Sequence, residues 1–252
     1  MTFEVAASAY DRFMGRYSRP LARRFADWSG VAAPGRALDV GCGPGALTEV
    51  LVDRLGVENV AAVDPSQSFV AALRQDRPGL DVRAGVAEQL PYADDLFDHV
   101  LAQLVVHFMS DPVAGLREMG RVTRPGGTVS ACTWNLAGDD SPLSLFWQAA
   151  RELDPQVEDE SGVPGAREGE LAQMFDRAGL SRIEPSALTV SVRHESFEQW
   201  WAPYTLGVGP PGAYVNTLDD DARSRLRERC RELVPEVPFD LKVTAWAVRA
   251  RA

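Results

Sequence analysis

RALDVGCGPGA, residues 36–46, places a short apolar run directly before a glycine-rich turn, which leads into a helical pattern over 46–55. Glycines let the backbone take conformations that other residues avoid, and they let a ligand approach the main chain closely. The free N–H groups at the start of the next helix would face such a ligand. A second apolar run, 59–63, ends in Asp64, where nucleotide-binding α/β folds carry a carboxylate that grips the ribose. The stretch therefore predicts a nucleotide-type site.

Strand and helix patterns alternate outward from this stretch. We expect strands at 36–40, 59–63, 80–84, 97–104 and 128–133. Helices are expected at 46–55, after Ser66 as N-cap, and from Asp111-Pro112, where proline takes its favoured early position. Such alternation implies a parallel sheet with helices on both faces.

The register changes after residue 134. We expect helices over 141–153, 170–178 and 219–233, a loop over 154–169, a Gly/Pro turn over 207–212, and two strands at 183–194 and 239–248. The last two strands can pair as neighbours. Residues 195–237 would then bulge between them as a cap.

The length of 252 residues fits one α/β domain with additions. Residues 1–30 carry apolar side chains at three- and four-residue steps, which predicts a helix. This helix either packs on the edge of the core or acts as a lid. We therefore expect a single domain over 1–252, with a lid at 1–30, a cofactor-binding core at 36–135 and a substrate cap at 195–237.

Composition limits the partners. The net charge is −10, whereas nucleic-acid binders usually carry a basic face. The chain has three cysteines, Cys42, Cys132 and Cys230, which lie far apart in the sequence. This spacing predicts neither a zinc site nor a disulfide framework, and it fits a cytoplasmic location. No apolar run reaches the ~18 residues of a membrane span, and the first residues lack the pattern of a signal peptide. Nothing in the pattern specifies an oligomeric state.

Five motifs in a fixed order resemble those of class I S-adenosylmethionine-dependent methyltransferases. They are LDVGCGPG (38–45), Asp64, GVAEQLPY (85–92), FDHV (97–100) and REMGRVTRPGG (117–127). Within this family the chain looks like the small-molecule group that includes the ubiquinone and menaquinone methyltransferases, because YDRFMGRYS (10–18) is similar to the N-terminal segment of such proteins.

The resemblance implies a Rossmann-like, doubly wound α/β fold whose seven-stranded sheet is mostly parallel with an antiparallel last strand. It also implies S-adenosylmethionine as cofactor, S-adenosylhomocysteine as product, and no metal. By position, Asp64 would bind the ribose, Arg16 the cofactor carboxylate, and Gln103 the methionine end. The full set of implied cofactor-binding residues is Tyr10, Arg16, Asp39, Gly41, Cys42, Gly43, Asp64, Pro65, Ser66, Ala87, Glu88 and Gln103.

His107 is the candidate catalytic base, because it follows the fourth strand and an unperturbed histidine changes charge near neutral pH. The alternative is a histidine that only caps or packs the next helix. Four aromatic side chains of the lid and the cap are candidates for a wall of the substrate site: Tyr17, Trp200, Trp201 and Tyr204. The alternative is that they only seal the cap onto the sheet. The acidic run 158–160 is interpreted as a solvated loop.

Two other functions stay open. Gly41-x-Gly43-x-x-Ala46 satisfies a loose dinucleotide fingerprint, so an NAD(P)-dependent oxidoreductase is one alternative. No Tyr-x-x-x-Lys pair accompanies it, since the only lysine is Lys242. The other alternative is a catalytically silent S-adenosylmethionine-binding protein, because a fold does not guarantee activity. A nucleic-acid methyltransferase is disfavoured, because QLVV (103–106) follows the fourth strand in place of an Asn/Asp-Pro-Pro-aromatic tetrad. The expected acceptor is therefore a small molecule.

Overall fold

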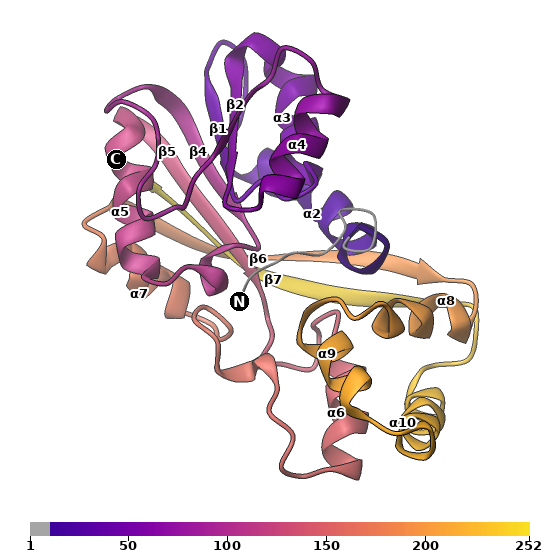
Figure 1. The fold of residues 1–252 in the computed structure, drawn as a ribbon. Helices are drawn as coiled ribbons and strands as arrows, with labels where there is room; N and C mark the ends of the chain where they lie inside the picture. Colours follow the sequence, from indigo (N-terminus) through magenta and orange to yellow (C-terminus); the bar gives the residue numbers. More distant parts are fainter. Residues whose placement is uncertain (1–10) are drawn as a thin grey trace.

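The computed structural model describes residues 11–252, so the predicted cofactor residue Tyr10 lies outside the described residues (Figure 1). Seven strands of this part form one sheet in the order β3-β2-β1-β4-β5-β7-β6. Their bounds are β1 Ala37–Val40, β2 Val60–Asp64, β3 Asp81–Ala84, β4 Phe97–Gln103, β5 Thr123–Trp134, β6 Ser181–His194 and β7 Phe239–Arg251. Strands β1 to β5 pair in parallel, and β7 is antiparallel to both β5 and β6. The predicted fold class is confirmed.

Helices cover both faces of the sheet. One hydrophobic cluster joins it to α2 (Arg16–Trp28), α3 (Ala46–Leu55) and α4 (Gln67–Asp76). A second cluster joins the opposite face to α5 (Pro112–Val122) and α7 (Glu170–Arg177). This is the doubly wound arrangement that alternating strands and helices predict.

Local chemistry explains several helix starts. The Ser66 hydroxyl accepts a hydrogen bond from the Phe69 N–H (3.5 Å), and the Asp111 carboxylate accepts one from the Ala114 N–H (3.0 Å). Both side chains satisfy N–H groups that have no partner inside the helix. The predicted Ser66 cap and the predicted helix start at Asp111-Pro112 are confirmed.

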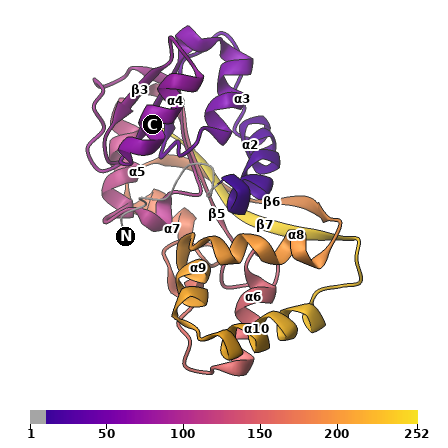
Figure 2. The same cartoon turned by 45° about the vertical axis from the view of Figure 1, so that its right-hand side comes forward.

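The remaining helices lie beyond the far ends of β6 and β7, where Figure 2 shows them grouped below the sheet. They are α6 (Ser144–Leu153), α8 (Phe197–Trp201), α9 (Gly209–Thr217) and α10 (Asp220–Leu233). Segment 195–237 supplies three of these helices, and α6 packs against α10 beside them. Short helical turns complete the described chain: η1 (Asp11–Gly15), η2 (Val57–Asn59), η3 (Val106–Phe108), η4 (Glu160–Gly162) and η5 (Ala202–Leu206).

Two local predictions are wrong. The expected turn at 207–212 opens a helix instead, because Pro210 and Pro211 occupy the first turn of α9, where proline costs no hydrogen bond. The Gly/Pro motif at 125–127 lies inside the β5 range, at an irregularity in its pairing with β4, rather than before the strand. The loop expected at 154–169 is present and contains the short helical turn η4.

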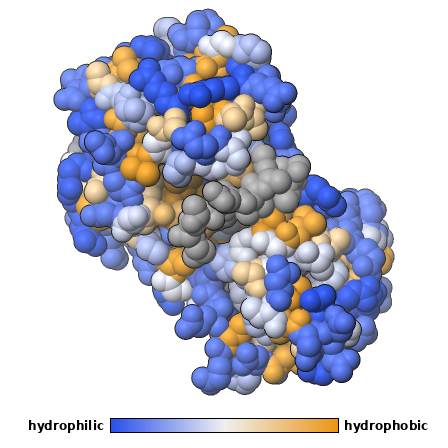
Figure 3. All heavy atoms as spheres, viewed as in Figure 1, coloured by the Kyte–Doolittle hydropathy of each residue, from blue (hydrophilic) through white to orange (hydrophobic). Residues whose placement is uncertain are grey.

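The described residues contain no helix with the length and apolar character of a membrane span. On the face shown in Figure 3, hydrophobic residues gather where the sheet half of the molecule meets the group of helices beyond β6 and β7.

Candidate functional site

The glycine loop is fastened to the end of β2 by its backbone. The N–H groups of Gly41 and Cys42 both donate to the Val63 carbonyl, at 2.8 and 3.1 Å. The next donor, the Gly43 N–H, binds an oxygen of the Asp64 carboxylate at 2.8 Å. Cys42 itself is buried and fills space beneath the loop.

Asp64 organises the carboxyl end of β2. Its second oxygen accepts a hydrogen bond from the Ser66 N–H at 2.8 Å. Burial raises the pKa of Asp64, and the N–H groups of Ser66 and Gly43 oppose that shift. Because each carboxylate oxygen has two lone pairs, both can accept a further hydrogen bond from a ribose hydroxyl. Pro65, which lies between Asp64 and Ser66, is exposed and forms the turn into α4.

Two glycines of the loop differ in what surrounds them. A Cβ atom on Gly41 would lie 2.4 Å from a methyl group of Val105, so side-chain packing requires glycine there. A Cβ atom on Gly43 would meet no atom within 4 Å. Both have positive φ angles, +71° and +52°, which glycine adopts readily. The loop is therefore packed on the Val105 side and open at Gly43, as a cradle for a ligand requires.

Asp39 lies beneath this loop near the end of β1. Its carboxylate is 1% exposed and accepts a hydrogen bond from the Thr48 hydroxyl at 2.6 Å. Burial is the main reason that its pKa rises to about 7, and the neighbouring Asp64 adds to the shift. A cationic ligand group beside the two carboxyl groups would favour their ionised forms.

Gln103 ends β4 and carries an unpaired buried acceptor. Its side-chain N–H donates to the Ser18 carbonyl of α2 at 3.1 Å. Its Oε1 atom is buried without a hydrogen-bond partner among residues 11–252, a costly state for a polar atom. An ammonium donor would satisfy it. With Asp39 and the glycine cradle, it gives a donor and acceptor set that fits the amino-acid end of S-adenosylmethionine.

Ala87 and Glu88 follow β3. Ala87 is buried, and Glu88 accepts hydrogen bonds from the N–H groups of Ser110 and Asp111 at 2.6 and 3.2 Å. The Glu88 carboxylate thus ties this loop to the start of α5. The resemblance to the methyltransferases implies that Ala87 and Glu88 flank the adenine of the cofactor, and that contact stays a prediction.

The structure places Arg16 and Tyr17 at the junction of α2 with β6. The Arg16 guanidinium donates to the Gln199 carbonyl at 2.8 Å and to Nδ1 of His194 at 3.3 Å. Since Nδ1 accepts, we assign the ring proton to Nε2, which lies 3.1 Å from the Tyr17 hydroxyl. The sequence predicts Tyr17 at the substrate, whereas in the structure the buried Tyr17–His194 contact holds α2 against β6. Arg16 is expected at the cofactor carboxylate, and its observed contacts serve the same docking.

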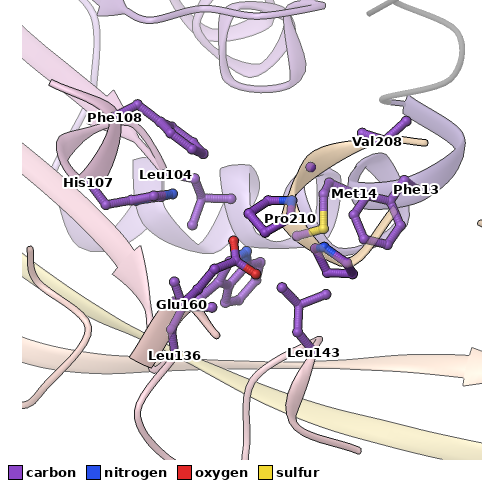
Figure 4. A pocket seen from close by; sticks show the side chains of 13 residues that line it. Phe13, Met14, Leu104, His107, Phe108, Leu136, Leu143, Glu160, Val208 and Pro210 are labelled. Atoms are coloured by element: carbon purple, nitrogen blue, oxygen red, sulfur yellow. The ribbon is translucent and has the colours of Figure 1, made fainter. Parts of the chain in front are cut away.

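A pocket opens beyond the end of β4, and Figure 4 shows the side chains that line it. It holds about 470 Å³ of empty space, counting the part open to solvent. Most of the wall is apolar. The lining residues are Phe13, Met14, Leu104, His107, Phe108, Trp134, Leu136, Leu143, Glu160, Val208, Gly209, Pro210 and Pro211.

His107 reaches this pocket from η3. Its Nδ1 atom is buried and has no hydrogen-bond partner in the described part of the chain. Burial lowers the pKa of the imidazole to about 4. The ring is therefore neutral at pH 7 and has a nitrogen available to accept a proton.

Glu160 is a pocket residue that the sequence interpretation missed. Its carboxylate accepts a hydrogen bond from the Trp147 indole N–H at 3.2 Å, and burial raises its pKa to about 7. The expectation of a solvated loop at 158–160 holds for the exposed Glu158 but only in part for Glu160, which is half-buried. No local signal could have found it, because an acidic run is ordinarily exposed and the burial comes from packing against α6.

The predicted aromatic wall lies behind the pocket rather than in it. Trp200, Trp201 and Tyr204 are at most 4% exposed and are absent from the pocket lining. The Tyr204 ring stacks on Phe146 at 4.6 Å and meets Phe13 edge-on at 5.4 Å. These rings therefore seal the helices against the sheet and support Phe13, which does line the pocket. Among residues 11–252, no group of three His, Cys, Asp or Glu side chains is placed to hold a metal ion.

Comparison with known sequences identifies relatives along most of the chain. Residues 38–131 match a family model described as a methyltransferase domain. An uncharacterized methyltransferase of Mycobacterium tuberculosis is 32% identical over 240 residues, which cover 94% of this chain and 87% of the relative. A demethylmenaquinone methyltransferase of Bacillus cereus is 30% identical over 178 residues, covering 62% of this chain and 74% of the relative.

Solved structures share the fold. The YcgJ protein of Bacillus subtilis superimposes with a TM-score of 0.58 at 20% identity, covering 93% of this chain and 97% of that one. An S-adenosylmethionine-dependent methyltransferase of Thermotoga maritima gives 0.52 at 19% identity, covering 97% and 98%. The sequence relatives, the ordered motifs and the sheet topology together show that the chain belongs to the class I S-adenosylmethionine-dependent methyltransferases.

Proposed function

We propose that this protein methylates a small, largely apolar molecule that binds in the pocket between η3, η4 and α9. The observation that carries the proposal is the position of a neutral imidazole, His107, in an apolar pocket just beyond the strand that ends in Gln103. A wall made mostly of apolar side chains with a few polar groups is typical of small-molecule sites. The relative named demethylmenaquinone methyltransferase accords with an apolar acceptor.

The predicted cofactor residues fit S-adenosylmethionine, which supplies an electrophilic methyl group when bound. Asp64 would hold the ribose hydroxyls, and Gln103 Oε1 with Asp39 would take the amino group. The protein then has to orient the acceptor and keep water away. Orientation of this kind contributes up to about 7–11 kcal/mol to a barrier.

His107 would take the proton that the acceptor loses. An acceptor with an O–H or N–H nucleophile loses that proton when it is methylated, and the free imidazole nitrogen of His107 would take it up, while S-adenosylmethionine would supply the methyl group. General base catalysis of this kind contributes about 10²–10⁴-fold. The low pKa of His107 keeps the ring in its proton-accepting form at every pH above about 5.

Incubation with methyl-labelled S-adenosylmethionine and a small-molecule extract tests the proposal. We expect label in one low-molecular-weight product, and a loss of that product in His107→Ala while S-adenosylhomocysteine still binds by calorimetry. Label that appears only in protein or nucleic acid would refute the small-molecule acceptor. Tight cofactor binding without any labelled product would favour a silent binding protein.

A further inference from the structure

The Glu160 carboxylate is held in place with one oxygen free. Its Oε2 atom accepts the Trp147 hydrogen bond, whereas its Oε1 atom has no hydrogen-bond partner among the residues that the structure describes. Next to it, Asp159 caps η4 by accepting a hydrogen bond from the Ser161 N–H at 2.9 Å and forms an ion pair with Arg151. Figure 4 shows the carboxylate directed into the pocket. The chain therefore presents a fixed acceptor to whatever enters.

The charges around Glu160 leave its carboxylate uncompensated. On its own loop, Asp159 is acidic and already paired with Arg151 of α6. Across the pocket, His107 is neutral. From η5, the Tyr204 hydroxyl donates to a backbone carbonyl. No cation of residues 11–252 forms an ion pair or hydrogen bond with the Glu160 carboxylate.

A carboxylate with apolar neighbours, one neutral hydrogen-bond donor and no counter-ion is costly, because it has lost part of its hydration without gaining an opposite charge. A bound cation removes that cost, and a charge-assisted N–H···O bond is about twice as strong as a neutral one. A hydroxyl would satisfy the free oxygen but leave the charge, and a second carboxylate would be repelled. The complementary ligand is therefore a compact apolar molecule with a positively charged nitrogen.

We propose that Glu160 selects the acceptor by pairing its free oxygen with a protonated amine on an otherwise apolar ring or chain. This inference rests on the proposed function, since it takes the pocket to be the acceptor site. It assigns to Glu160 recognition of the acceptor, and leaves proton transfer from the nucleophile to His107.

Four matched probes separate the chemistry: benzylamine, benzyl alcohol, toluene and benzoate. Each is titrated by saturation-transfer NMR in the presence of S-adenosylhomocysteine. We expect benzylamine to bind at least tenfold more tightly than toluene, benzyl alcohol to lie between them, and benzoate to bind least. Glu160→Gln keeps the size and the Trp147 contact but loses the charge, and should bring benzylamine to within about twofold of benzyl alcohol. Glu158→Gln, on the exposed side of the same loop, should leave the order unchanged.

The wild-type protein supplies a second readout that needs no variant. The Glu160 pKa is about 7, so the carboxylate is mostly protonated at pH 6 and mostly ionised at pH 8. Benzylamine stays protonated over this range. Its affinity should therefore rise about tenfold from pH 6 to pH 8, whereas that of toluene should stay constant.

Equal affinity of benzylamine and toluene would overturn the inference, and so would a wild-type protein that binds no benzylamine. These outcomes are distinct from failure of the proposed function, because probe binding is read without turnover. If the protein methylates a small molecule but shows no preference for benzylamine, only the role of Glu160 is refuted, and the proposed function stands. Amine preference without any labelled small-molecule product would refute the proposed function alone.

Discussion

The Asp64 carboxylate accepts a hydrogen bond of 2.8 Å from the backbone N–H of Gly43, which ties the glycine loop after β1 to the end of β2. The same side chain binds the Ser66 N–H at the start of α4. One carboxylate thus connects the loop to α4 and also has lone pairs left for the predicted hydrogen bonds to a ribose.

Replacing Asp64 with alanine should weaken the binding of S-adenosylhomocysteine about 10–100-fold, because hydrogen bonds to a charged acceptor contribute about 1.5–3 kcal/mol. The fold should survive with a lower free energy of unfolding, since two backbone N–H groups lose their acceptor. Calorimetry and urea unfolding measure the two effects. Asp53→Ala, at an exposed position of α3, is the matched control and should change neither. Unchanged affinity in Asp64→Ala would mean that the ribose binds elsewhere.

We expect different effects when each of the two loop glycines is replaced by alanine. Gly43→Ala places its Cβ in open space, so only the positive φ should cost stability, by about 1–2 kcal/mol. Its cofactor affinity should nevertheless fall, because the methyl group enters the cradle. Gly41→Ala adds an overlap with Val105, and overpacking costs roughly a further 1–3 kcal/mol.

The double variant Gly41→Ala/Val105→Ala tests that assignment by urea unfolding. This variant should recover the stability that Gly41→Ala loses through the overlap with Val105, but not the stability lost through the positive φ angle. Equal stability of the two single variants would show that contact with Val105 does not constrain the loop.

Local patterns were enough to place the sheet core. Alternating apolar runs and the glycine turn place β1 to β4 within one residue of their predicted limits, because these signals act between neighbours in sequence, whereas β5 begins five residues earlier than predicted. Helix α9 was missed because Gly209, Pro210 and Pro211 favour a turn until the helix that they open is seen. The long antiparallel pair of β6 and β7 was expected, although both strands run past their predicted ends.

The acceptor site was less accessible from sequence than the cofactor site. The cofactor motifs lie within single loops, whereas the pocket brings together side chains from η1, η3, η4 and α9. Glu160 carries no local sign of burial, and Trp200 resembles a ligand-binding aromatic until its exposed fraction of 2% is known. Side-chain burial depends on contacts between distant segments. Residue type alone therefore could not distinguish residues that line the pocket from residues that pack behind it.

His107→Ala should lower kcat about a hundredfold or more while leaving the affinity for S-adenosylhomocysteine within about twofold, because the ring acts on the acceptor's proton. A conservative His107→Asn variant, which can donate and accept hydrogen bonds but cannot take the proton, should show the same loss. His99→Asn is the matched control, since His99 lies in β4 outside the pocket. Turnover at the wild-type rate in both His107 variants would leave the histidine a packing residue.

Acid should weaken the junction between α2 and β6 through His194. Burial, with a smaller effect of Arg16, lowers the pKa of His194 to about 4, and Asp240 opposes this shift. In the unfolded chain the same ring takes a proton below about pH 6.5. Between these values the unfolded state binds more protons, so the contribution of His194 to stability is complete above about pH 6.5 and is lost as the pH falls toward 4.

From pH 7 to pH 5 this group should therefore cost about 2 kcal/mol of unfolding free energy. Urea unfolding at both pH values, compared between wild type and His194→Gln, isolates it, because the opposite effect of the raised pKa values of Asp39 and Glu160 is common to both proteins. His194→Gln should lose about 2 kcal/mol less than wild type over this step. An equal loss would show that the ring has the same pKa in the folded protein as in the unfolded chain, so that it is protonated at pH 5 in both. In that case Nδ1 could not accept the hydrogen bond from Arg16, and the junction would depend on other contacts.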